Sequence, residues 1–168
     1  MHYIFFCILL FFSVFTSAQN NFSNLKNKIL LADSVLLISH ASTSLKPRSE
    51  MSLTQYRLIL SGKVNQKIII ERKIVKGKSL QYLSKLISSP FKDKTIEKGR
   101  CFNPRNTIFI FKGKRISFID ICFECREIES SNDIKIPEND FDNSKWQKLE
   151  YFFKEHGFVY GFDTPSSD

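Results

Sequence analysis

The sequence lacks the short motifs that commonly identify a catalytic or cofactor site. Its six glycines are scattered, so no glycine-rich loop is present to hold the phosphates of a nucleotide. It also lacks the G-x-S-x-G, H-E-x-x-H and calcium-loop patterns that mark many hydrolases, zinc peptidases and EF-hand proteins. We therefore expect no cofactor. The sequence favours a protein that is not an enzyme, without deciding the question.

Long apolar runs are also missing, apart from one at the start of the chain. Residues 3–15 are nearly all apolar, which is shorter than the roughly 20 residues that a membrane-spanning helix needs. The small residues Thr16 and Ala18, just before Gln19, are typical of a signal-peptide cleavage site. We expect residues 1–18 to be a signal peptide. The protein is then exported, periplasmic or extracellular, and does not span the membrane.

The rest of the chain has the length of one ordinary domain. Without residues 1–18, the 168-residue sequence keeps 150 residues, enough to bury about two-thirds of the surface that the unfolded chain exposes. We expect residues 19–163 to form a single domain whose core does not depend on disulfides. Residues 164–168 are expected to be a disordered tail.

The charge of +8 is unevenly distributed along the chain. The basic segment, residues 46–115, holds 18 Lys or Arg against 4 Asp or Glu, whereas residues 116–168 hold 5 against 12. A basic face in an exported protein would suit an anionic cell-envelope component, such as a lipid headgroup, lipopolysaccharide or an acidic glycan. Its aromatic residues show no stacking platform, so nucleic acid is not expected as a partner. The alternatives are solvated charges, a protein partner, and attraction between the two halves. The sequence leaves open whether the segment forms one face.

Alternating apolar residues predict strands, and helical spacing predicts helices. The expected strands are residues 34–40, 54–61, 67–76, 107–111 and 115–123. Two helices are expected clearly: residues 79–88, with Ser79 as N-cap, and a helix that begins at a capping box of Ser144 and Gln147 and ends at Gly157. Residues 22–31 show a weaker helical pattern. Residues 54–61 and 67–76 are expected to pair as a hairpin, and residues 127–141 to be a loop. The expected fold class is α+β, with a mostly antiparallel sheet of about five strands and two or more helices packed on one face.

Three cysteines are the most distinctive feature outside the leader. Cys101 precedes one apolar strand, and Cys122 and Cys125 end the next. If the two strands form a hairpin with a three-residue loop, Cys101 lies opposite Cys125, and a two-residue loop shifts it by one position. Every register brings Cys101 near the other two, at separations that a disulfide tolerates.

Three roles remain open for these thiols. The first is a structural disulfide, with Cys101–Cys125 the expected pairing and Cys122 buried. The second is a redox site at Cys122-x-x-Cys125, although no helix signals follow the motif. The third is a zinc site, in which His156 or His40 completes a set of three thiolates. We expect neither histidine to be a zinc ligand. His156 lies in the last turn of its helix, where a partly cationic ring suits the helix dipole. His40 lies at the end of a strand, where a histidine is more often hydrogen-bonded to a neighbouring group.

Four residues near the cysteines are expected to support the site. Pro104 and Arg105 follow Cys101, whereas Asp120 and Glu124 lie beside the other two cysteines. A buried carboxylate needs a partner, and the hairpin places Arg105 across from both acids. We expect an ion pair from Arg105 to Asp120 or Glu124 to brace the site. The alternative is that these groups line a small-ligand pocket.

The segments Cys101-Phe-x-Pro-Arg105 and Ile121-Cys-Phe-x-Cys125 resemble two boxes of an uncharacterised family of small exported bacterial proteins. The resemblance covers roughly residues 100–126 and implies a shared scaffold around the cysteines, without an activity. Relatives often carry histidine where this chain has Asn106. The sequence thus predicts an exported binding or interaction domain with a structural disulfide. The alternative is a thiol-redox or zinc-binding protein that uses Cys101, Cys122 and Cys125.

Overall fold

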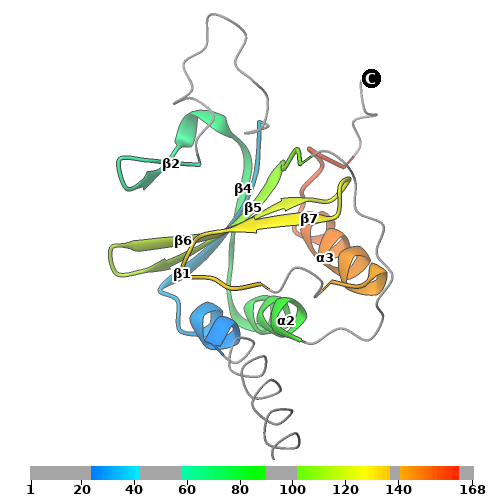
Figure 1. Ribbon diagram of the computed structural model, residues 1–168, viewed down its shortest axis with the longest axis horizontal. Helices are drawn as coiled ribbons and strands as arrows, with labels where there is room; N and C mark the ends of the chain where they lie inside the picture. Colours follow the sequence, from blue (N-terminus) through cyan, green and yellow to red (C-terminus); the bar gives the residue numbers. More distant parts are fainter. Residues whose placement is uncertain (1–23, 42–57, 90–101, 137–140, 163–168) are drawn as a thin grey trace, which may run out of the picture.

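The computed structural model describes residues 24–41, 58–89, 102–136 and 141–162 (Figure 1). One antiparallel sheet has the strand order β4-β1-β5-β6-β7. Its strands are β1 (Ser34–His40), β4 (Ile69–Val75), β5 (Asn106–Lys112), β6 (Arg115–Cys122) and β7 (Glu127–Ser130). The helical segments are residues 24–30, α2 (Gly77–Ser88) and α3 (Asn143–Glu155). This architecture confirms the predicted α+β class and its five-stranded antiparallel sheet.

The helices pack on one face of the sheet, as predicted (Figure 1). Each helix contributes buried residues to the same core, for example Ile29, Leu83 and Leu149. They meet the side chains of Ile108 and Ile119, which point from β5 and β6 towards the helices. Burying a side chain of this size contributes roughly 1.5–3 kcal/mol, so this face supplies most of the apolar stabilisation.

The opposite face carries a second, smaller core. Because side chains alternate along a strand, Phe109 points away from the helices and packs with Ile38, Leu58 and Ile68. This core is covered by a small hairpin, β2 (Ile59–Leu60) and β3 (Lys63–Val64), followed by the short 3₁₀ helix η2 (Gln66–Ile68). The sequence correctly predicted that β5 is apolar on both sides because it is buried in the middle of the sheet.

The predicted hairpin between residues 54–61 and 67–76 is wrong. β2 pairs with β3, whereas β4 pairs with β1, which is distant in sequence. The reason lies in Ser61 and Gly62, which both have positive φ and close a tight turn directly after β2. The chain then leaves the small hairpin and joins the large sheet as an edge strand. Residues 54–57 lie outside the described part.

Three local predictions also need correction. α3 is capped by the Asp142 side chain, which accepts a 2.7 Å hydrogen bond from the amide of Lys145, and not by Ser144. α2 begins at Gly77, before the expected N-cap Ser79. Residues Glu127–Ser130 form strand β7, where a loop was expected, because their backbone pairs with the edge of β6. Asp142 is the better cap for α3, and pairing with β6 makes β7 a strand, whereas the N-cap of α2 is Lys76, without a side-chain cap hydrogen bond.

Candidate functional site

An open groove of about 1040 Å³ lies between the helical residues 24–30 and the β5–β6 hairpin. Its lining is dominated by basic and amide side chains around a small apolar floor. The residues are Asn24, Asn27, Lys28, Leu31, Ile110, Lys112, Lys114, Arg115, Ser117 and Asp133. We call it the cationic groove, because four of its side chains are Lys or Arg against one carboxylate.

The β5–β6 turn forms one rim of the cationic groove. Lys112 pairs with Arg115, so Gly113 and Lys114 make a two-residue turn in place of the expected three-residue loop. Gly113 has φ +57°, which glycine adopts without strain and which suits the first position of such a turn. The hairpin register therefore follows the two-residue alternative.

This turn already binds a carboxylate of the protein itself. Lys112 Nζ lies 2.8 Å from Asp33 Oδ1, and the amide of Gly113 donates to Asp33 Oδ2 at 2.7 Å. The hydrogen bond from Lys112, and then that from Gly113, lower the pKa of Asp33 from its ordinary value. The turn thus provides a geometry that recognises an anion.

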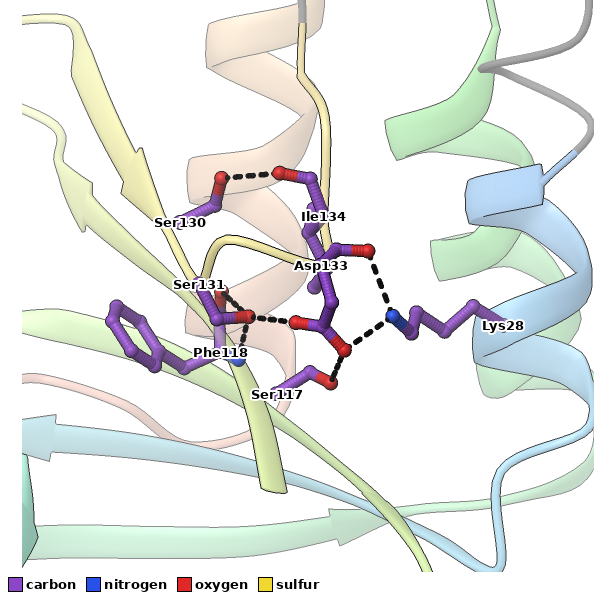
Figure 2. A network of polar contacts seen from close by, with 7 residues as sticks. All are labelled: Lys28, Ser117, Phe118, Ser130, Ser131, Asp133 and Ile134. Atoms are coloured by element: carbon purple, nitrogen blue, oxygen red, sulfur yellow. Dashed lines mark hydrogen bonds and ion pairs between the residues drawn. The ribbon is translucent and has the colours of Figure 1, made fainter. Parts of the chain in front are cut away.

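A polar network fixes the opposite wall, as Figure 2 shows. Lys28 Nζ donates to Asp133 twice, to Oδ2 at 2.6 Å and to the main-chain oxygen at 2.8 Å. The hydroxyls of Ser117 and Ser131 each donate to the same carboxylate at 2.7 Å. Burial alone would raise the pKa of Asp133, but these hydrogen bonds outweigh it and hold the pKa far below 3.8. The network ties the first helix to β6 and to the turn after β7.

Two cations of the groove are thereby neutralised by the protein, whereas the other two have no ion-pair partner among the residues that the structure describes. Lys28 and Lys112 form the ion pairs with Asp133 and Asp33. The ion pairs found among the described residues do not involve Lys114 or Arg115, and both side chains are exposed. These two residues therefore give the groove its net positive charge.

The cysteines lie at the other end of the β5–β6 pair. Cys122 is the last residue of β6, Cys125 lies in the turn that follows, and both are buried. The amide of Cys125 donates to Cys122 Sγ at 3.2 Å. The two residues lie close together and are not joined to each other by a disulfide. Cys101 lies outside the described residues, so the expected Cys101–Cys125 bond stays a prediction.

The expected ion pair from Arg105 is wrong within the described part of the chain. There, no ion pair connects Arg105 with Asp120 or Glu124. The Arg105 guanidinium instead lies 5.8 Å from the ring centre of Tyr160, in a cation–π contact. Pro104 is buried beside it, and Glu124 is exposed. The prediction assumed that the strand continues to Glu124 and so places it across from Arg105. In the structure β6 ends at Cys122, and Glu124 lies in the turn that follows.

Asp120 has buried partners that the sequence did not predict. Its Oδ1 lies 3.1 Å from His40 Nε2 and accepts a 2.7 Å hydrogen bond from the Thr107 hydroxyl. The other ring nitrogen of His40 lies 2.7 Å from the oxygen of Ala41, so a ring that donates from both nitrogens satisfies both contacts. The side chains of His40 and Asp120 are 0% and 3% exposed. Solvent does not reach this dyad, which braces the sheet end.

The remaining metal candidates have structural roles where the structure describes them. His156 is the C-cap of α3, and its Nδ1 bonds to the oxygen of Phe152 at 2.7 Å, in agreement with the interpretation as a last helical turn. The described residues contain no cluster of three or more His, Cys, Asp or Glu side chains with metal-binding geometry.

Among the described helices, none combines enough length and apolar character to span a bilayer.

Comparison with known proteins adds no family to this description. No protein-family model matches the chain, and neither a curated protein nor a solved structure matches it. The functional interpretation therefore depends on the groove and the thiols themselves.

Proposed function

We propose that this protein is an exported binding protein that holds an anionic ligand in the cationic groove. The observation that carries the proposal is the convergence of Lys28, Lys112, Lys114 and Arg115 on one open groove. These residues come from a helix and a hairpin that are far apart in sequence. An anionic component of the cell envelope is the partner class that this charge and the predicted export favour.

The groove can hold an anion by hydrogen bonds as well as by charge. Asn24 and Asn27 line it beside the cations and offer amide donors. The way in which Lys112 and Gly113 hold Asp33 shows that the rim is already arranged around a carboxylate. A ligand phosphate or carboxylate would extend this arrangement towards Lys114 and Arg115.

Heparin, a soluble polyanion, tests the proposal. The protein should bind heparin at low ionic strength and lose it as salt is raised. Lys114→Gln with Arg115→Gln should weaken binding about 10–30-fold, because each cation near an anionic surface contributes about 1 kcal/mol. Lys63→Gln with Lys67→Gln is the matched control, since both lysines are exposed, Lys63 on β3 and Lys67 on η2, and neither lines the groove. Equal loss in the two double variants would show non-specific charge attraction and reject the groove.

The proposal includes a structural disulfide between Cys101 and Cys125. It would close a loop of about 25 residues and stabilise the fold by roughly 3 kcal/mol in the chain-entropy model. The burial of Cys125 and Cys122 supports it, because buried sulfurs at a sheet end are protected from exchange. Alkylation with intact mass should find one reactive thiol in the exported, denatured protein and three after reduction. Three thiols without reduction would reject the bond.

A thiol-redox or zinc-binding protein is the second candidate. The observation that favours it is the closeness of the two thiols, shown by the hydrogen bond from the Cys125 amide to Cys122 Sγ, because a redox pair or a metal site needs its sulfurs side by side. A redox pair would equilibrate with glutathione buffers between dithiol and disulfide forms. A zinc site using Cys101, Cys122 and Cys125, with His156 as the fourth ligand, would show a native mass that exceeds the denatured mass by one metal ion. If neither behaviour is found, this candidate is rejected.

A further inference from the structure

The cationic groove is bordered by exposed leucines. Leu30 ends the first helical segment and Leu31 follows it. They are 36% and 67% exposed, and Leu31 lines the groove itself. Below them, the buried side chain of Ile110 forms part of the groove floor. Single exposed leucines are common, but two in succession beside cations that form no ion pair with a described residue make a surface with both apolar and positive parts.

The contacts of Asp33 hold this surface in one arrangement. Asp33 follows the leucines by two residues, and its carboxylate is bound by Lys112 and Gly113 of the hairpin turn. Its main-chain amide also donates to the oxygen of Phe111 at 2.9 Å. The end of the helix is therefore fixed against the hairpin, and the leucines stay beside the cations before any ligand arrives. Figure 1 shows this helix and the β5–β6 hairpin at the same end of the molecule.

We infer that the ligand of the cationic groove is the phosphate headgroup of an anionic lipid in a membrane surface. This inference rests on the proposed function and names its partner. Lys114 and Arg115 meet the headgroup phosphates, and Leu30 and Leu31 enter the boundary between headgroups and acyl chains. Peripheral proteins combine the same two contributions, buried apolar area and attraction to anionic lipid.

The composition of the groove favours a lipid over other anions. A free phosphate or a glycan would satisfy the cations but leave Leu31 two-thirds exposed to water. A single-stranded nucleic acid would need aromatic side chains for base stacking, and none of the described residues that line the groove is aromatic. A lipid surface is the partner that uses both the charge and the apolar residues.

Vesicle sedimentation tests this inference, using phosphatidylcholine vesicles with and without phosphatidylglycerol. Each variant is expressed with its leader and purified after export, so that all proteins compared have the same N-terminus. The wild type should sediment with the anionic vesicles, and raised salt should reduce binding. Leu30→Gln with Leu31→Gln should weaken vesicle binding about tenfold and heparin binding by a much smaller factor, because heparin meets the cations and offers no acyl chains to the leucines. Val159→Gln, at a residue 57% exposed on the C-terminal segment, is the control for lost apolar surface.

The outcomes separate this inference from the proposed function. If the leucine variant binds anionic vesicles like the wild type, or if vesicles are not bound while heparin is, the lipid inference is wrong and the anion-binding function stands. If Lys114→Gln with Arg115→Gln changes neither heparin nor vesicle binding, both are wrong. Matching far-UV circular dichroism and melting temperatures show that each variant is folded.

Discussion

Replacing Asp133 by asparagine removes one negative charge from the network that joins the first helix to the sheet. The side chain keeps nearly the same shape, so the variant isolates the charge. In the wild type the carboxylate accepts hydrogen bonds from Lys28, Ser117 and Ser131, all at 2.6–2.7 Å. Because Lys28 is the only charged donor of the three, its ion pair is the main contact that the substitution weakens.

The size of the effect follows from these contacts and from solvent exposure. Hydrogen bonds to a charged group contribute about 1.5–3 kcal/mol each when they are buried. The Asp133 side chain is 32% exposed, and solvent screening lowers the contribution of such pairs. We expect Asp133→Asn to lower the free energy of unfolding by about 1–2 kcal/mol near neutral pH. For a domain of this size, the melting temperature then falls by about 5 °C.

The pH dependence checks the cause. The pKa of Asp133 is lower in the folded state than the ordinary value of 3.8. Its stabilising contribution is therefore complete above about pH 4 and is lost as the pH falls from there towards the folded pKa. The difference between wild type and Asp133→Asn should narrow below pH 4 in urea unfolding curves. Glu129→Gln, which removes an exposed carboxylate from β7, is the charge control. A difference that is absent at pH 7, or that is unchanged at low pH, would refute the reasoning.

Further substitutions test the fold around the site. Gly161→Ala should destabilise more than Gly157→Ala, because both have positive φ but only at Gly161 would a Cβ lie 3.1 Å from Arg105; equal melting temperatures would contradict this. Asp120→Ala should lower the free energy of unfolding in urea by about 3–5 kcal/mol, since it leaves His40 buried without its carboxylate partner. A decrease of less than about 1 kcal/mol would show that the dyad is not an ion pair. Phe153→Ala, at a fully buried ring of α3, should cost about 3–5 kcal/mol by the same measurement, and a smaller loss would indicate that the core collapses around the gap.

Local sequence patterns predicted the elements better than their partners. The periodicities identified β1, the β5–β6 hairpin, α2 and α3, because each pattern depends on residues that are close in the chain. The β4 pairing was missed, since its sequence fits a hairpin with residues 54–61 equally well. Strand β7 was missed because residues 127–130 are too short and polar to show alternation, and only pairing with β6 makes them a strand.

The supporting site was predicted only in part, for the same reason. The two-residue register, one of the alternatives, brings Arg105 near the end of β6, where its amide bonds to the oxygen of Ile121. The partner of Asp120 was nevertheless His40, which is 80 residues away. Nothing in the local sequence of β1 indicates which carboxylate its last residue will face. Strand order decides that.

The amino-acid sequence by itself determined the apolar run of residues 3–15, the uneven charge, the α+β class and the alternation that makes both faces of β5 apolar. These properties depend on composition and on neighbouring residues. The tertiary structure alone decided the cationic groove, because its residues come from the first helix, the β5–β6 turn and the turn after β7. It also decided which cations are neutralised, since Asp33 and Asp133 reach Lys112 and Lys28 only after the helix has packed on the sheet. Sequence fixes which charges exist, and packing fixes which of them stay available to a ligand.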